Sequence, residues 1–390
     1  MNPPAAQPTT LPLSSVSDLL TPGAPLPFRV LDGQGRMLLA QGQLIMDARQ
    51  LKALLERGAC VVYEEVQTER EARARTAGGA AGLTPSTRKL TWFDHWERHV
   101  WTIDDTLRGL ARDPAAGPQL DQLVTQQIAL VSSQPEAALF TLVRQDDRRF
   151  ALYALVHARF TALVVQLTAT VMGWPDAKLR SAVGAALTMN VSIVELQARM
   201  AEQSEPPSKK QMEQIRAHPN QAAEMLRASG VADADWLAGV EDHHEQAGGA
   251  GYPRAIEAPS ELARLVRAAD VYTAKISPRA FRAAMPPQTA ARQLFQEVPG
   301  SAIAGSLIKA LGIYPPGDLV RLKNGEAGVV VRRVGAGLEV ALLLNAQNKP
   351  VGSGPRRDTA QPEFAVTGPL AERNGLPRLL PEQVYGLLYA

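Results

Sequence analysis

The stretch EDHHEQAGGAGYPRAIEAPSELARLVRAAD, from Glu241 to Asp270, decides the fold of this chain. It begins near two adjacent histidines, His243 and His244, crosses a glycine-rich loop and enters a segment whose apolar side ends at Asp270. Apolar residues on both sides of the loop recur at helical spacing, so we predict two helices joined by that loop. A buried imidazole or carboxylate needs a partner, because burying a polar group without one costs free energy.

Four of the six histidines lie on apolar faces of predicted helices, and these are His157, His218, His243 and His244. Asp270 lies on the apolar side of a further helix. A single residue of this kind is more often a satisfied core residue than a ligand. Imidazoles and a carboxylate that converge from several helices of one bundle, however, are how helical proteins build metal sites. The sequence therefore predicts a metal site of these five side chains, with a packed core as the alternative.

Composition limits the class of protein. With 390 residues and 45% hydrophobic content, the chain can bury a large core in two or three domains. The net charge of +2 gives no broad field for nucleic acid, so no nucleic-acid partner is expected. The most apolar segment, 150–174, contains His157, Arg159 and Gln166, which argues against a membrane span. Cys60 is the only cysteine, which excludes a disulfide framework and fits a cytoplasmic protein.

The patterning predicts a mainly α protein with a small N-terminal α+β module and a short C-terminal β-meander. The module is expected to contain a hairpin around Asp32-Gly33, a helix capped by Asp47 and a strand at 59–63. The predicted divisions are a disordered tail at 1–24, the module at 25–66, an exposed linker at 67–90, connecting helices at 91–133, a helical domain at 134–312, the β-meander at 313–349 and a Pro/Gly/Arg-rich tail at 350–390 that closes with a helix.

The helical domain resembles the HD-GYP family of bacterial cyclic-dinucleotide phosphodiesterases, a branch of the HD-domain metal phosphohydrolases. The resemblance rests on HHEQAGGAGYP at 243–253 and on ARLVRAADVYTAKISPRAFR at 263–282. His157 stands at the family's leading histidine position, and His218-Pro219 matches its His-Pro step. The resemblance implies an HD-domain-like helical bundle, and the ions that such sites use are divalent Fe, Mn or Zn.

The sequence departs from the family at its defining His-Asp pair. Met189-Asn190 stands there, and Ile193 replaces a lysine. In the family the aspartate bridges two metal ions, the histidine binds one of them, and the lysine helps to hold phosphate. A thioether is a poor ligand for hard cations, and a neutral amide supplies no bridging charge. We therefore predict no intact catalytic set, and either one divalent metal on the histidines and Asp270 or no metal.

The resemblance also implies a binding surface around the Gly-Tyr-Pro loop, for a cyclic dinucleotide or a diguanylate-cyclase-type signalling protein. Its residues are Gly251, Tyr252, Pro253, Arg254, Tyr272, Arg279 and Arg282. Guanidinium groups suit phosphate, and the tyrosines could stack on a guanine. The alternative for the arginines is a solvated helix end.

Three functions follow from these residues. The favoured one is an HD-GYP-like signalling protein that is catalytically impaired and binds a nucleotide or a partner protein. The second is an active metal-dependent cyclic di-GMP phosphodiesterase with a reduced metal site. The third is a structural helical scaffold that binds neither metal nor nucleotide. The sequence leaves open whether the chain forms a homodimer.

Overall fold

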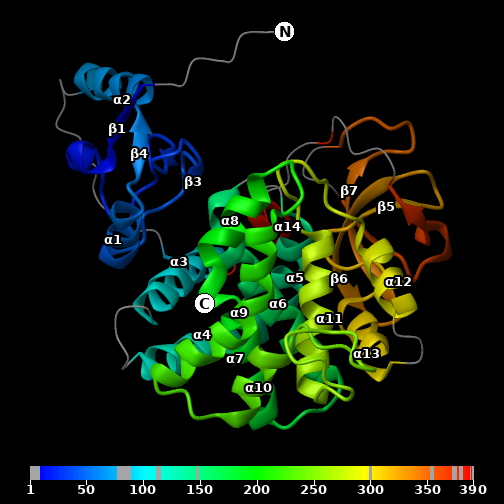
Figure 1. Cartoon of the computed structure of the whole chain (residues 1–390). Coiled ribbons are helices and arrows are strands. Elements are labelled where there is room, and N and C mark those ends of the chain that lie inside the picture. Colours follow the sequence, from blue (N-terminus) through cyan, green and yellow to red (C-terminus); the bar gives the residue numbers. More distant parts are fainter. Residues whose placement is uncertain are drawn as a thin grey trace.

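The structure is a computed structural model that describes residues 9–76, 89–110, 116–145, 149–297, 301–351, 355–370, 376, 381–386 and 388. Figure 1 shows a helical body with the N-terminal module on one side and a β-sheet on the other. The predicted class, mainly α with a small α+β module and a C-terminal β-meander, is confirmed. The predicted divisions between domains stay predictions, and only the elements inside them are compared below.

The N-terminal module is a four-stranded antiparallel sheet with two helices. Its strands are ordered β1-β4-β2-β3. The elements are β1 Thr10–Pro12, η1 Leu13–Leu19, β2 Val30–Leu31, β3 Met37–Leu39, α1 Ala48–Glu56, β4 Cys60–Val62 and α2 Tyr63–Thr76. The Asp47 side chain accepts a hydrogen bond from the backbone N–H of Gln50, so the predicted cap of α1 is present. The hairpin and the strand were also predicted correctly.

Two expectations about this region are wrong. Part of the predicted disordered tail forms β1 and η1, because Leu13, Val16 and Leu19 bury their side chains in the core. Part of the predicted linker is helical, since α2 continues to Thr76. Residues 1–8 and 77–88 lie outside the described residues.

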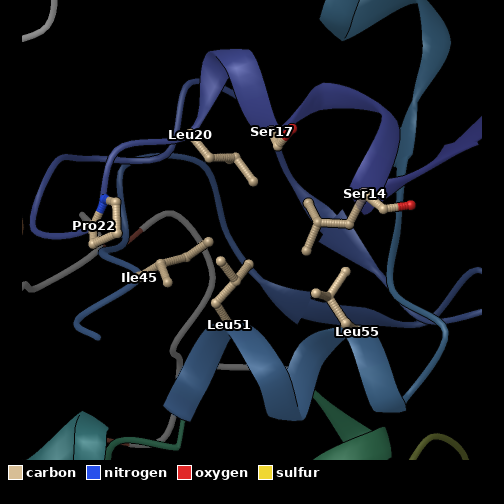
Figure 2. A pocket seen from close by; sticks show the side chains of 8 residues that line it. Ser14, Ser17, Leu20, Pro22, Ile45, Leu51 and Leu55 are labelled. Atoms are coloured by element: carbon tan, nitrogen blue, oxygen red, sulfur yellow. The ribbon is translucent and has the colours of Figure 1, made fainter. Parts of the chain in front are cut away.

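A small apolar hollow of about 90 Å³ lies in the module between η1 and α1. Figure 2 shows Leu20, Ile45, Leu51 and Leu55 turned toward it, with Ser14 and Ser17 on the η1 side. None of the histidines lines this hollow. It is therefore separate from the predicted metal site.

The helical body surrounds α6, which contacts α3, α4, α7, α8, α11 and α13. The bounds of its elements are α3 Trp92–Leu110, α4 Gly117–Ser133, α5 Pro135–Val143, η2 Phe150–Leu152, α6 Tyr153–Val171, α7 Asp176–Thr188, η3 Val191–Ile193, α8 Val194–Glu202, α9 Lys209–Ala228, α10 Ala234–Asp242, α11 Glu261–Ile276, α12 Pro287–Glu297 and α13 Ala302–Leu311. The predicted connecting helices α3 and α4 bury their apolar sides in the same core as α6. The connecting helices and the helices that follow them therefore share one hydrophobic core.

Two stretches, Phe150–Val171 and Asp176–Glu202, are long and apolar enough to cross a membrane by composition. Their most apolar windows are 83% and 72% buried inside the protein, as is typical of core helices. These two stretches therefore do not by themselves indicate a membrane span.

The body differs from the sequence prediction at two helix boundaries. The alanine-rich sequence of 177–200 predicts one continuous helix. The helix ends instead at Thr188, and a short 3₁₀ turn carries the chain into α8. A proline after His218 predicts that a new helix begins at Pro219, since proline is common in the first turn of a helix. That prediction is wrong, because α9 runs through the proline without ending. A proline inside a helix removes one backbone donor, and the carbonyl left free finds another partner here, as described below.

A five-stranded antiparallel sheet follows the body, in the order β8-β7-β6-β5-β9. Its elements are β5 Leu319–Leu322, β6 Ala327–Val334, β7 Gly337–Leu344, β8 Arg356–Asp358, η4 Pro362–Phe364 and β9 Val366–Pro369, with α14 Pro381–Tyr385 after it. The predicted tail therefore supplies two edge strands, which corrects that expectation. One face of the sheet packs against Phe140 of α5 and Val384 of α14, which joins the sheet to the body.

Buried ion pairs join the N-terminal module to the body. Arg57, at the end of α1, donates two hydrogen bonds to the Asp104 carboxylate on α3, whose side chain is 0% exposed. α3 then contacts α6 through Arg159, whose guanidinium donates to the backbone carbonyl of Trp96 at 2.7 Å. The module is thus connected, through α3, to the helix that carries His157.

Candidate metal centre

Three imidazoles meet where α9, α10 and the following loop come together. His218 lies on α9, His243 ends α10 and His244 follows it. Their ligand nitrogens all lie within 4.8 Å of one another, and the ring centroids are 4.2 to 5.1 Å apart. We call His218, His243 and His244 the triad. Among the described residues, the triad is the cluster of three or more His, Cys, Asp or Glu side chains that lie close enough together to hold a metal ion.

The proline inside α9 orients His218. In a regular helix the N–H of residue 219 would donate to the carbonyl of Ile215, but Pro219 has no N–H. The His218 Nδ1 lies 2.5 Å from that free carbonyl oxygen. Because a carbonyl only accepts, the hydrogen of the ring lies on Nδ1. Nε2 is then unprotonated and directed away from the helix.

The end of α10 orients His243 in the same way. The last carbonyls of a helix lack partners within the helix, and Val240 is near the end of α10. The His243 Nδ1 lies 2.7 Å from the Val240 carbonyl oxygen and donates to it. The Nε2 of this ring also carries a free lone pair. Two backbone carbonyls that lack a backbone donor thus fix the tautomers of His218 and His243. One lacks its donor because of the proline, and the other because the helix ends.

The two free lone pairs face each other. Nε2 of His218 and Nε2 of His243 are 3.1 Å apart. Protonation is disfavoured, because burial lowers the pKa of His218 to about 4 and, together with the charge of the neighbouring imidazoles, lowers the pKa of His243 well below its usual value. Two nitrogen ligands bound at about 2.1 Å to one ion lie roughly 3 to 3.4 Å apart. The donor set of the triad therefore fits one divalent metal ion.

His157 and Asp270 form the other half of the predicted site. His157 on α6 donates from Nε2 to the Asp270 carboxylate on α11 at 2.7 Å, and its side chain is 3% exposed. Burial alone would raise the pKa of Asp270, but the hydrogen bond and charge of His157 outweigh it and the pKa is lowered. The carboxylate also acts electrostatically on His218 and His243. All five predicted ligands thus lie in one region, in two groups with different bonding.

Met189, Asn190 and Ile193 form the break between α7 and α8. Met189 is fully buried in the apolar core, and Asn190 and Ile193 are each 7% exposed. The turn that contains them lies against α9, where the Ser192 hydroxyl donates to the His218 backbone carbonyl at 3.0 Å. The break therefore lies next to the triad but supplies no carboxylate or imidazole to it. That the site lacks a bridging ligand stays a prediction.

The Gly-Tyr-Pro loop covers the triad. Glu245 is 1% exposed and accepts hydrogen bonds from the backbone N–H groups of Arg254 and Ile256, which closes the loop. A Cβ on Gly251 would lie 2.4 Å from the Glu245 Cα, so only glycine fits there. The Tyr252 ring stacks on His244 with centroids 4.5 Å apart. One face of Tyr252 is therefore occupied by a triad histidine, which leaves a single face for the predicted contact with a guanine.

The other predicted binding residues differ in their surroundings. Tyr272 is 2% exposed inside the core, so it does not suit the predicted stacking on a nucleotide. Arg254 forms an ion pair with Asp242 rather than presenting a free guanidinium. Arg282 donates to the backbone carbonyls of Ala274 and Ser277. The guanidinium groups of Arg254 and Arg282 are thus engaged within the protein, and the predicted binding surface stays a prediction.

Arg279 has a different environment. Its Nε and one terminal nitrogen lie 3.4 and 3.3 Å from the Tyr153 hydroxyl. The Tyr153 ring in turn stacks on His157, with centroids 5.7 Å apart and planes 7° apart. Of the predicted arginines, Arg279 is therefore the one held beside the predicted ligands.

Sequence reasoning missed two residues of this region, Tyr153 and Arg267. Tyr153 precedes His157 by four positions on α6, and Arg267 precedes Asp270 by three on α11, so each shares a helix face with a predicted ligand. Burial, then the charges of His218 and Arg267, lower the pKa of His244 to about 3. Helical spacing from a predicted ligand was the signal that could have found both.

Comparison with known proteins found a family model and two similar proteins. A model of the HD domain family matches residues 128–299. Cyclic di-GMP phosphodiesterase PA4108 of Pseudomonas aeruginosa is 30% identical over 254 residues, which are 61% of this chain and 60% of the relative. The chain thus spans about 60% of that relative's length. The structure of Bd1817, an HDG"Y"P protein from Bdellovibrio bacteriovorus, has a TM-score of 0.50 and 15% identity, covering 78% of this chain and 99% of that protein, and shows a similar fold.

Proposed function

We propose that this chain is a member of the HD-GYP family and a cyclic-dinucleotide signalling protein that binds one divalent metal ion and is impaired in hydrolysis. Support for the nucleotide class comes from the relative in Pseudomonas aeruginosa that is a cyclic di-GMP phosphodiesterase. Support for the impairment comes from the site, in which Met189 and Asn190 stand where the family has its His-Asp pair.

The observation that carries the proposal is the opposed lone pairs of His218 and His243, 3.1 Å apart. Such a pair is repulsive unless a cation lies between the nitrogens. His157 and Asp270, in contrast, satisfy each other through a hydrogen bond. One ion on the triad therefore accounts for the geometry without a second ion. The metal would be Fe, Mn or Zn, which accept imidazole nitrogen.

When bound, such an ion lowers the pKa of a coordinated water and polarises a phosphoryl oxygen. A two-metal site holds its ions about 3.5 to 4 Å apart, and their mutual repulsion must be offset by a negative bridging ligand. Asn190 is neutral, so it offers no such charge. With a single ion, the residues of this chain are better suited to binding and orienting a phosphate ester than to activating the water that would hydrolyse it.

A second candidate function is an active phosphodiesterase with a single metal ion. The observation that favours it is that the triad supplies three nitrogen ligands, which leaves coordination positions for water or substrate. Under this alternative the purified protein hydrolyses cyclic di-GMP, and His243→Ala abolishes the activity.

One experiment separates the two functions. We would measure metal content and cyclic di-GMP hydrolysis of the native protein and of the double variant Met189→His, Asn190→Asp. The proposal expects about one ion per chain and negligible turnover before the change, and a second ion with faster turnover after it. Native turnover equal to that of the double variant would contradict impairment. Absence of both metal and nucleotide binding would leave the structural scaffold as the function.

Partners and location remain proposals. The loop at 251–253 is intact and partly exposed, so a diguanylate-cyclase-type protein is the expected protein partner. A pull-down with the loop variant Tyr252→Ala as control tests this contact. The cytoplasmic location expected from the single cysteine and the homodimer also stay predictions.

A further inference from the structure

The hollow between η1 and α1 in the N-terminal module plays no part in the proposed function. Its deep end is formed by Leu13, which is fully buried, and Ile45, which is 3% exposed. Leu51 and Leu55 of α1 form one wall, and Leu55 is 42% exposed. The hollow is therefore open to solvent at one end and ends in buried carbon atoms at the other.

Both walls of the hollow are held by contacts outside it. At the two ends of α1, Asp47 pairs with Arg98 and Arg57 pairs with Asp104, and both partners lie on α3. At the beginning of η1, the backbone N–H of Leu13 donates to the carbonyl just before β4 at 2.8 Å. Neither wall can move toward the other without breaking these contacts. The hollow is therefore preformed, as small-molecule sites usually are.

The lining of the hollow is apolar and uncharged. Apart from Ser14 and Ser17, all of its residues are Leu, Ile or Pro. Figure 2 shows the two serine oxygens on the η1 side, turned away from Leu51. Among the described residues neither of these hydroxyls has a partner, whereas the Ser15 hydroxyl donates to the Pro12 carbonyl at 2.7 Å. The interior thus accepts carbon atoms, and the two hydroxyls at its edge can bond a polar group.

The volume of the hollow limits its ligand to a small molecule. It measures about 90 Å³. An apolar cavity of about 150 Å³ holds one benzene ring, so by proportion about four carbon atoms fit here. Sites for drug-sized ligands measure roughly 300 to 1,000 Å³. The size therefore admits one short alkyl chain and excludes a drug-sized molecule.

We propose that this hollow is a binding site for a small neutral amphiphile. An alkyl chain of about four carbons lies on Ile45 and Leu51, and an uncharged polar end, such as a hydroxyl, lies beside Ser14 and Ser17. The site requires neither the metal ion nor the nucleotide, so it goes beyond the proposed function and is tested independently of it. α1, which forms one wall, is also paired with α3. The ligand therefore contacts the helix that joins the module to the body.

A series of straight-chain alcohols, from 1-propanol to 1-octanol, tests the site on the full-length protein. NMR spectra of the Ile and Leu methyl groups would give the affinity at Ile45, Leu51 and Leu55. Each methylene that becomes buried should raise the affinity about fourfold. The increase should stop at about 1-butanol or 1-pentanol, because any further carbon lies in solvent. An affinity that still rises at 1-octanol, or no binding at any length, would overturn the proposal.

The charge of the polar end is tested at a fixed chain length. Pentanoate should bind at least about threefold more weakly than 1-pentanol, because the lining offers no cation to replace the water that a carboxylate loses. Pentanoate that binds as tightly as 1-pentanol would contradict the assignment of a neutral ligand.

Substitutions in the wall separate this site from binding to any apolar surface. Leu55→Gln removes part of the wall at an exposed position, so it should lower the affinity for 1-pentanol about tenfold and leave the melting temperature unchanged. Tyr63→Gln is the matched control, because Tyr63 is also 42% exposed in the module but does not line the hollow. Its affinity should stay within about twofold of the wild type.

A second substitution fills the hollow instead of opening it. Leu51→Phe places a ring in the space that the alkyl chain needs, so it should abolish binding of 1-pentanol. Melting curves of each variant show that it is folded. Equal affinity in the wild type, Leu55→Gln and Leu51→Phe would refute the site. Self-association of the wild type that Leu55→Gln abolishes, without any binding of alcohols, would also refute it and would assign the hollow to a contact between chains.

Discussion

The two halves of the candidate site contain similar residues in opposite states. In the triad, His218 and His243 each donate a hydrogen bond from Nδ1 to a backbone carbonyl, and the lone pairs on their Nε2 atoms face each other. In the other half, His157 donates its Nε2 hydrogen to Asp270, and the carboxylate accepts it. The first half has two opposed lone pairs, whereas the second half is joined by a hydrogen bond that leaves only the His157 Nδ1 buried without a partner among the described residues.

The difference shows that the number of histidines does not define a metal site. The backbone partner of each ring determines which nitrogen is free, and only free nitrogens bind metal. In the triad these partners are an unfilled carbonyl inside α9 and another at the end of α10. The variants and pH changes below test whether the two halves are as different as their hydrogen bonds indicate.

Substitution of one histidine from each half should give the largest contrast. His243→Ala removes a nitrogen ligand and should weaken zinc binding by more than about 100-fold, since even the loss of an outer partner of a ligand costs 10-fold to 100-fold. His157→Ala should change zinc affinity by less than about threefold, because its Nε2 is committed to Asp270. Competition calorimetry measures both. Equal losses would mean that the two halves form a single centre.

A change in the loop tests how the triad is covered. The Cβ of Gly251→Ala would lie 2.4 Å from the Glu245 Cα and 2.5 Å from the Gln246 backbone nitrogen, so the loop must move. Overpacking of this kind costs about 1 to 3 kcal/mol in the free energy of unfolding, which urea titration measures. Gly248→Ala is the matched control, because its φ of +78° is strained but its Cβ meets no atom. Its expected cost is about 1 kcal/mol. A larger loss in the control would contradict this account.

A buried histidine outside the site sharpens the comparison through pH. His99 on α3 is 2% exposed, and burial, followed by the charge of Arg159, lowers its pKa to about 3. The unfolded chain binds a proton there near pH 6.5 and the folded chain does not, so stability falls as the pH drops below that value.

His99→Leu should remove this dependence. When the pH falls from 7.5 to 5, the unfolding free energy of both proteins should decrease. The decrease should be about 2 kcal/mol smaller in the variant than in the wild type, because one pKa unit corresponds to 1.36 kcal/mol. Denaturant titration of the metal-free protein at both pH values measures the difference. The acid sensitivity that remains would include the triad, whose pKa values are also lowered. An unchanged pH dependence would show that His99 is not the source.

The smallest expected effect is on metal affinity between pH 7.5 and 5.5. Three ordinary imidazoles would lose about 1,000-fold in affinity at pH 5.5, about tenfold each, because protons compete with the metal. In the triad the pKa of His218 is about 4 and that of His244 about 3, so both rings are neutral at pH 5.5. The metal affinity of the protein should therefore fall by no more than about twofold to threefold between pH 7.5 and pH 5.5. A loss near that of free imidazoles would show that the rings titrate normally.

The sequence could single out side chains that the fold brings together, because the signals for them are local. Two adjacent histidines at a helix end, and single histidines on apolar faces, are candidate ligands that can be recognised without knowledge of the fold. The sequence could not show which ring nitrogen is free, because that depends on carbonyls such as those of Ile215 and Val240. It also misplaced Tyr272, since helical spacing does not state which side of a helix meets a neighbour.

The larger errors in the fold have a similar cause. The Pro/Gly/Arg-rich tail forms β8 and β9 only because they pair with β7 and β5, and such non-local pairing leaves little trace in composition. Met189 and Asn190 fall at a helix break that the alanine-rich pattern hid. Pro219 misled the prediction in the opposite direction, because proline more often begins a helix than lies inside one.

That proline has a consequence for engineering the protein. Replacing it with alanine would restore a backbone donor to α9, and a scan for thermostable variants would select the change. The restored donor would compete with the His218 ring for the Ile215 oxygen. The imidazole would then be free to rotate or to change tautomer. The helix would become more stable while the triad would bind its metal ion less well. Thermal stability and metal affinity are therefore opposed at this single position.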